Sequence, residues 1–484
     1  MALIAPLEAV TGALIRQRGV SDWQIHHHTE RSAQLFLIGP AIETRRLFST
    51  ERIQTRIYND HPPHITSGGN AGTHGEGRVR EGGLGGAASR RDFNRQRSGA
   101  SASMVRGATT RALLSEEIAD QGRLTRALEE AVFIAGLTDN PPYSLPRPLS
   151  GLYPDVETVD GALIASDASR MAVLGELRER LLAAVAAESG IRLSSAELYA
   201  TSGEVALRSS QGIDIASSET DLFCDLVLIA GDSDQAAEYH AMPQRRRLAD
   251  LNIEEMTSQA AQYARDSLRA EMPATHEGPV VISGEALVDL FSPLIFHSSA
   301  RAAYQSMSRL QLGQPISGEQ DIDGDRLTFI SNALLPYGTS SAPFSEEGLP
   351  GERLVIVQDH LLQSWWAEQR YADYLHIRPT GSFANIEIPA GAHPVQDLLG
   401  NGPVYHLVAF SWLNPDELTG DFVAEIKLGY RVEHGQTTPI KGGSLSGNLF
   451  EALGNVRLSR ETQFTGNYSG PAALHFERLT IAGA

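Results

Sequence analysis

The sequence predicts an α+β fold with two domains, in which N-terminal helices pack on a mostly antiparallel sheet and a strand-rich domain follows. Helical patterns alternate with clusters of strand patterns rather than with single strands, which favours α+β over a doubly wound parallel sheet. The chain has 484 residues, 42% hydrophobic and 20% charged, so it is long enough to bury two cores. We place the boundary at Pro273 to Gly278, with domains at 1–275 and 276–484.

Composition and charge narrow the class of protein. No apolar run approaches the roughly 18 to 20 residues that cross a bilayer, and the N-terminus lacks a signal-peptide pattern, so we expect a cytoplasmic protein with no membrane partner. Cys224 is the single cysteine, which excludes an intramolecular disulfide, and its apolar surroundings indicate a core position. Lys and Arg number 40 against 59 Asp and Glu, a net charge of −19, so we expect no nucleic-acid partner.

The first 58 residues are expected to form a helix followed by strands. Residues 35–38 are apolar, and residues 52–58 alternate between apolar and polar types. The run His26-His27-His28 precedes them. Because adjacent residues of a strand point to opposite faces, three consecutive histidines do not converge on one metal ion. We therefore expect a surface feature here.

Residues 60–111 have a different composition. They contain eleven glycines and eight arginines. Such a segment buries too little apolar surface to offset the entropy lost on ordering, so we expect a mobile Gly/Arg-rich insertion in the N-terminal domain.

Three helices and three strand patterns complete the N-terminal domain. The apolar spacing predicts helices over 115–137, from an N-cap at Asp167 to Gly190, and over 252–268. Alternating segments at 196–207, 222–229 and 238–242 indicate strands.

The stretch from Thr419 to Val456 dominates the second domain. Residues 426–432 alternate and end at His434-Gly435, which predicts an antiparallel hairpin. The glycine-rich turn that follows precedes a short helix and is expected to offer exposed backbone beside the hairpin, and so a large two-chain interface. The candidate interface residues are Gly442, Gly443, Gly447 and Asn448.

A strand pair, a glycine-rich turn and a helix entry in this order resemble the C-terminal signature of the TldD/PmbA family, the modulator of gyrase metallopeptidases. The resemblance continues through 344–348 (FSEEG) and 479–483 (LTIAG). It implies a relationship to zinc peptidases whose active members carry a His-Glu-x-x-x-His motif on a helix, with a later cysteine as a further ligand and the glutamate as general base.

The matching segment here is 290–297 (LFSPLIFH). Ser292 replaces the first histidine, Pro293 replaces the glutamate, and only His297 remains. Residues 462–468 contain no cysteine or histidine where the later ligand belongs. We therefore expect a vestigial segment, no catalytic residue, no metal site and no cofactor in this chain, with zinc held by a catalytic partner.

The resemblance implies a non-catalytic TldE/PmbA-like subunit of a TldD/TldE-type metallopeptidase complex, acting in proteolysis or peptide maturation and supplying interface and substrate chamber. Its expected partners are a TldD-like catalytic subunit or a second copy of itself, and a peptide or unfolded protein as substrate. The alternative is a stand-alone hydrolase that uses an unrecognised site.

Overall fold

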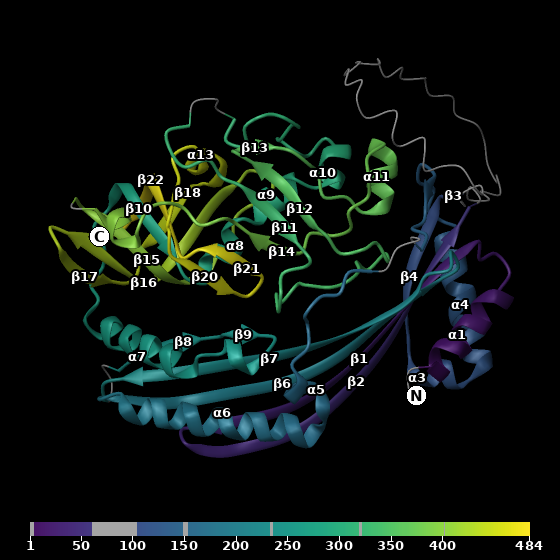
Figure 1. The fold of residues 1–484 in the computed structure, drawn as a ribbon, viewed down its shortest axis with the longest axis horizontal. Helices are drawn as coiled ribbons and strands as arrows, with labels where there is room; N and C mark the ends of the chain where they lie inside the picture. Colours follow the sequence, from purple (N-terminus) through teal and green to yellow (C-terminus); the bar gives the residue numbers. More distant parts are fainter. Residues whose placement is uncertain (1–3, 61–103, 149–152, 233–235, 319–321, 401) are drawn as a thin grey trace, which may run out of the picture.

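The computed structural model describes residues 4–60, 104–148, 153–232, 236–318, 322–400 and 402–484. It confirms the α+β fold. A long, curved antiparallel sheet carries the N-terminal domain, and the strand-rich C-terminal domain lies over one face of that sheet, with α6 along the opposite face (Figure 1). No described helix is both long and apolar enough to cross a membrane.

The N-terminal sheet has the order β4-β2-β1-β6-β7-β8, with β9 also paired to β7, and every one of these pairings is antiparallel. The predicted strand segments lie within β1, β2, β6, β7 and β8, except that β8 ends at Ala241, one residue before the predicted end. The bounds are β1 Asp22–Ile38, β2 Ala41–Asn59, β4 Gly107–Leu113, β6 Ile191–Ser209, β7 Asp214–Ala230, β8 Ala237–Ala241 and β9 Gln244–Arg245.

Two groups of helices cover opposite ends of this sheet (Figure 1). Helices α1, α3 and α4 pack on β1, β2 and β4, whereas α6 and α7 share a core with β1, β6 and β7. The bounds are α1 Ile4–Arg16, α3 Ser115–Ala119, α4 Gln121–Ala135, α5 Gly161–Ala165, α6 Asp167–Ala187, the 3-10 turn η2 Leu248–Asp250, and α7 Ile253–Arg269.

The helix predictions need two corrections. The expected helix over 115–137 is interrupted at Asp120, whose side chain accepts a hydrogen bond from the Arg123 N–H and caps α4. The cap of α6 is Ser166, not Asp167, because the Ser166 hydroxyl accepts from the Ser169 N–H at 3.0 Å. The helix predicted over 252–268 is confirmed as α7.

The predicted mobile insertion at 60–111 lies for the most part outside the described residues. Its last residues are ordered strands, contrary to the prediction. Residues Met104–Val105 form β3, which pairs with β5 (Tyr143–Ser144), and β4 begins at Gly107 and pairs with residues 53–59 of β2. The composition of these residues offers little apolar surface to offset the entropy lost on ordering. The backbone hydrogen bonds of the strand ladder offset it instead.

The C-terminal domain is built on a sheet that closes on itself. Its order is β10-β15-β16-β18-β22, and β22 pairs back onto β10, so the five strands form a barrel around a large apolar core. The bounds are β10 His276–Ser283, β15 Val404–Leu413, β16 Asp421–Glu433, β17 Gln436–Ile440, β18 Ser444–Asn448, β19 Arg457–Leu458 and β22 Ala473–Ala482. The predicted hairpin is confirmed as β16–β17, with positive φ at His434 and Gly435.

A second sheet, in the order β13-β12-β11-β14-β21-β20, packs against the barrel. Its strands are β11 Phe329–Asn332, β12 Arg353–Gln358, β13 Leu361–Leu362, β14 Asn385–Glu387, β20 Thr462–Thr465 and β21 Tyr468–Pro471. Short helices connect the strands: α8 Ala286–Leu290, α9 Ser292–His297, α10 Ala300–Tyr304, α11 Gln369–Leu375, α12 Val395–Leu399 and α13 Leu449–Leu453.

One buried arginine joins the two domains. Arg246, which follows β9, is 4% exposed. Its guanidinium donates hydrogen bonds to the backbone carbonyls of Gly338 (2.6 Å), Thr339 (2.7 Å) and Ser341 (3.1 Å), and pairs with Glu219 on β7 at 3.1 Å. The planar guanidinium has enough donors to satisfy all of these acceptors at once.

Replacing Arg246 with alanine is expected to lower the free energy of unfolding by about 3 kcal/mol, because three carbonyls would lose their donor in a buried position. The matched control is Arg378→Ala, which removes a two-bond ion pair with Glu352 at the surface, where Arg378 is 64% exposed. The control should cost less than about 1 kcal/mol. Urea unfolding of both variants measures the difference. An equal loss in the free energy of unfolding would show that the buried contacts of Arg246 do not stabilise the junction.

Candidate functional site

The predicted vestigial segment lies on α8 and α9, which are separated at Phe291. Ser292 and Pro293 occupy the first turn of α9, where a proline's missing N–H costs no helical hydrogen bond. His297 is the last residue of this helix. The segment is therefore helical in this structure, over six residues.

His297 is 1% exposed, and both of its ring nitrogens are engaged. Nε2 lies 2.9 Å from the carbonyl of Leu418 and donates to it, while Nδ1 accepts from the Arg309 N–H at 3.1 Å. The ring also packs edge-on against Phe450 at 5.2 Å. Burial lowers the pKa of His297, which fits a neutral ring that donates from one nitrogen and accepts at the other.

These residues do not fit the zinc site that the resemblance implies. A histidine binds zinc through a nitrogen lone pair, and in His297 one nitrogen carries a donated proton and the other accepts a backbone N–H. Residues 462–465 and 468–471, where the later ligand belongs, pair with each other as β20 and β21. Within the described ranges, no group of three or more His, Cys, Asp or Glu side chains is placed to hold a metal ion.

The glycine-rich stretch has a different role from the expected one. Gly442 and Gly443 have positive φ (78° and 69°), so they form the predicted turn. Residues 444–448, however, form β18, which pairs with β16 on one side and β22 on the other. Residues 444–446 are paired on both sides in the barrel wall, and 447–448 are paired with β16, so the expectation of exposed backbone here is wrong. A two-chain interface at these residues stays a prediction, but exposed backbone no longer supports it.

Gly447 and Asn448 serve packing and capping. A Cβ on Gly447 would lie 2.4 Å from Leu479 Cδ2, so no larger residue fits there without a shift. The Asn448 side-chain oxygen accepts from the N–H groups of Phe450 and Glu451 and caps α13, and its amide donates to Thr419 O at 2.9 Å.

The histidine run is not the expected surface feature throughout. His27 on β1 is fully buried, and its Nε2 lies 2.8 Å from Glu51 Oε1 on β2. Burial lowers the pKa of His26 to about 4. Cys224 is buried as predicted, and burial raises the pKa of its thiol to about 12, which suits a core residue rather than a nucleophile.

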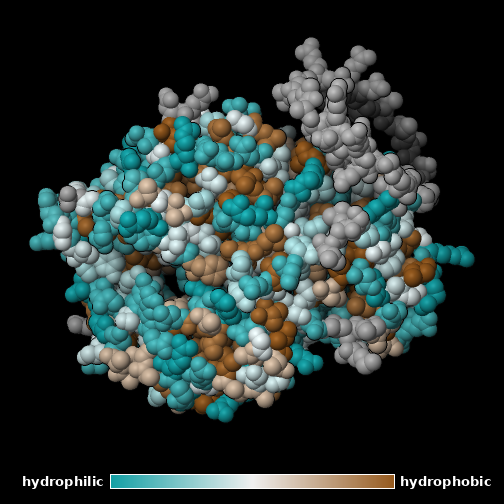
Figure 2. All heavy atoms as spheres, in the orientation of Figure 1, coloured by the Kyte–Doolittle hydropathy of each residue, from teal (hydrophilic) through white to brown (hydrophobic). Residues whose placement is uncertain are grey.

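A cleft between the two domains has a volume of about 540 Å³. Residues 239–242 of β8 and its end line one wall, and residues 408–413 of β15 line the other, with α7 and α8 at its sides. Figure 2 shows an opening at this level between the domains. No sequence pattern pointed to this cleft, because its walls come from segments more than 160 residues apart.

Polar groups converge in this cleft. The Ser283 hydroxyl lies 2.8 Å from His406 Nε2, and His240 Nε2 lies 2.6 Å from an oxygen of Asp225. Burial lowers the pKa of His406 to about 4, so its ring is neutral at pH 7. Burial also raises the pKa of Glu285, the residue before α8. The cleft can therefore hydrogen-bond a polar chain and presents carboxyl groups to it.

The conspicuous FSEEG segment lies at the domain junction. Gln24 on β1 donates to the Glu347 carbonyl at 3.1 Å, and Tyr153 donates to the Gly348 carbonyl at 2.9 Å. The Glu347 carboxylate accepts the Gln369 N–H at the start of α11 at 2.8 Å. Burial raises the pKa of Glu347 to about 7 despite this hydrogen bond.

Residues 275–483 match the family described as the PmbA/TldA metallopeptidase C-terminal domain. The chain is 24% identical over 288 residues to an uncharacterized protein of Methanocaldococcus jannaschii, covering 56% of this chain and 65% of that protein. It is 26% identical over 239 residues to the metalloprotease PmbA of Escherichia coli O157:H7, covering 47% and 51%. The matches thus span about half to two thirds of these relatives.

Two crystal structures share the fold. TldE from Thermococcus kodakarensis superposes with a TM-score of 0.74 at 16% identity, over 99% of this chain and 100% of that one. A protein described as a candidate modulator of a DNA gyrase, from Thermotoga maritima, superposes with a TM-score of 0.74 at 16% identity, over 98% of this chain and 100% of that one. The fold and the matched domain define a two-domain, metallopeptidase-related protein. Residues 275–483 match the PmbA/TldA metallopeptidase C-terminal domain, and the chain as a whole is similar in fold to TldE.

Writing the family motif back into α9 is expected not to create a zinc site. The double variant Ser292→His with Pro293→Glu restores the order His-Glu-x-x-x-His, but His297 keeps both nitrogens in backbone hydrogen bonds. Calorimetric titration with zinc should therefore give the same heat for the double variant and the parent. Tight, stoichiometric binding by the variant alone would contradict this structural role of His297.

Neutralising the junction carboxyl should stabilise the protein at high pH. The pKa of Glu347 is raised from 4.5 to about 7 in the fold, so its protonated form stabilises the native state and this stability is lost as the pH rises between those values. Glu347→Gln should gain about 2 kcal/mol over the parent at pH 8, and less as the pH falls toward 4.5. Urea unfolding across this range measures it. The neighbour variant Glu346→Gln is the control, and a pH-independent gain would contradict the assignment.

Proposed function

We propose that this chain is a non-catalytic, TldE/PmbA-like subunit of a TldD/TldE-type metallopeptidase complex, acting in proteolysis or peptide maturation. The observation that carries the proposal is the environment of His297. The one residue retained from the metal motif is buried and hydrogen-bonded through both nitrogens to Leu418 and Arg309, so it serves as a packing residue. Zinc and the general base then come from a TldD-like catalytic partner.

The match of residues 275–483 to a metallopeptidase C-terminal domain supports a link to peptide hydrolysis, and the likeness to a structure described as TldE supports the subunit type. The cleft between the domains supports a role in holding substrate. Its walls are the ends of two strands, β8 and β15, whose backbones suit an extended peptide, and its floor combines neutral histidine with carboxyl groups. In this proposal the subunit supplies part of a substrate chamber and an interface.

A second candidate function, hydrolysis by this chain alone, is favoured by one observation. Ser283 and His406 lie within hydrogen-bond distance in the cleft, as a serine nucleophile and its base must. No described residue hydrogen-bonds to Nδ1 of His406, so the third group that orients the base in such sites is missing from the described part of the chain. We therefore place this function second.

One reconstitution experiment separates the two functions. The purified chain, a TldD-like protein that carries His-Glu-x-x-x-His, and their mixture are assayed on unstructured peptides, each with bound zinc measured. The first proposal expects zinc in the partner only, and full activity only in the mixture. It also expects Ser283→Ala to leave the activity of the mixture within about twofold of the parent. Hydrolysis by the chain alone that Ser283→Ala abolishes would instead establish the second function.

A further inference from the structure

One edge of the N-terminal sheet is open. Strand β2 pairs with β1 along its whole length, but β4 covers its other side only at residues 53–59. Among the described residues, 41–52 of β2 therefore have no neighbour on that side. Twelve residues of strand extend about 40 Å. Unpaired N–H and C=O groups in such a row are a template for another strand.

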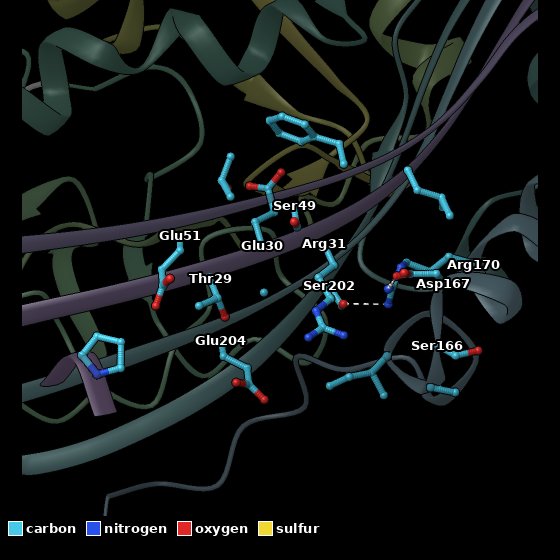
Figure 3. Close-up of a pocket in the computed structure, with 17 residues that line it drawn as sticks. Thr29, Glu30, Arg31, Ser49, Glu51, Ser166, Asp167, Arg170, Ser202 and Glu204 are labelled. Atoms are coloured by element: carbon cyan, nitrogen blue, oxygen red, sulfur yellow. Dashed lines mark hydrogen bonds and ion pairs between the residues drawn. The ribbon is translucent and has the colours of Figure 1, made fainter. Parts of the chain in front are cut away.

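Apolar side chains stand on this open edge. Leu47 and Phe48, at its middle, are 59% and 50% exposed. Folded proteins commonly protect a long edge with a covering helix or loop. A groove of about 680 Å³ also lies over the sheet face formed by β1, β2 and β6, between α1 and α6, and Ser49 and Glu51 line it together with Arg170 (Figure 3). The edge at residues 41–52 is accessible within the described structure, because no described strand pairs with it and its apolar side chains are exposed.

We propose that residues 44–52 of β2 pair antiparallel with the same residues of a second copy of this chain, about a two-fold axis at Phe48. The two N-terminal sheets then become one continuous sheet, as an isologous contact requires. This contact goes beyond the proposed function, since it joins two copies of this chain and leaves the C-terminal domain free for a catalytic partner.

The side chains select this pairing. In a strand, every second residue points its N–H and C=O groups toward the open edge. Two identical strands pair only when these residues face each other, so the residue numbers of each pair must sum to an even number. With the axis at Phe48, Phe48 faces its own copy and Arg46 faces Thr50. Arg45 then faces Glu51 twice, once on each side of the axis. Arg45 has no partner among the described residues of its own chain, and Glu51 is 43% exposed.

The neighbouring registers are disfavoured by charge. Moving the axis one residue back, to Leu47, places Glu43 opposite Glu51. Moving it one residue forward, to position 49, places Arg46 opposite Arg52. Like charges directly opposite each other destabilise a ladder, whereas opposite charges and aromatic pairs stabilise it by roughly 0.2–1 kcal/mol each. The Phe48 register avoids both repulsions.

Disulfide trapping tests the register directly. The only native cysteine, Cys224, is fully buried. Any disulfide between two chains therefore forms through the introduced cysteine. Directly opposite residues have Cβ atoms about 4.5–5.5 Å apart, so Phe48→Cys should give a covalent dimer under mild oxidation. In the control Arg46→Cys, the two copies lie about 13 Å apart and should not link. The double variant Arg46→Cys with Thr50→Cys should link again.

Light scattering of the full chain tests the association itself. The parent should be dimeric at about 50 μM, and Arg45→Glu should weaken the dimer at least tenfold, because it sets two carboxylates opposite each other on each side of the axis. Adding Glu51→Arg to that variant should restore the dimer. Because this exchange removes the His27 contact with Glu51, circular dichroism and a melting curve verify folding.

Three results would overturn the proposal. The first is a parent that stays monomeric at this concentration. The second is equal linking of the Phe48→Cys and Arg46→Cys variants, which would show contact without a fixed register. The third is strand pairing by this edge with a catalytic partner only, which the same cysteine variants would reveal as a covalent link to that partner and not to a second copy.

Discussion

The contact between Arg246 and the 338–341 loop fixes how the two sheets of this protein face each other. A buried guanidinium needs all of its donors satisfied, and here the acceptors come from the other domain. Arg246 therefore ties the N-terminal sheet to the loop after β11. On the barrel side, the Tyr430 hydroxyl donates to Asp266 of α7 at 2.8 Å. The cleft between β8 and β15 lies between the two domains that these contacts join.

The segment that the resemblance matches to the metal motif is part of the core in this structure. His297, Arg309 and Phe450 form a packed group in which the imidazole links α9 to the loop before β16. Burial favours the neutral imidazole, and a neutral imidazole is what this pattern of one donor and one acceptor requires. His297 therefore has a structural role in this chain.

Local patterns in the sequence predicted the fold class, α7, and the β16–β17 hairpin, because periodicity and turn residues act over a few positions. These local patterns failed where contacts with distant segments determine the structure. Residues 444–448 look like a turn, yet two flanking strands make them β18. The burial of His27 depends on elements from elsewhere in the chain, and the Arg246 acceptors lie 92 to 95 residues away. The candidate cleft shares this dependence on distant segments, which leaves no local signal.

Closure of the barrel carries a consequence for synthesis. Strand β10 pairs with β22, so Val281 lies opposite His475, almost 200 residues later. On the ribosome, residues 276–283 are made long before the strand that closes the barrel, and their apolar groups wait unpaired until 473–482 emerge. Contacts of such sequence separation fold slowly and expose apolar surface in intermediates. Every strand of the N-terminal sheet precedes β10 in the chain, so this sheet is synthesised before the barrel can close.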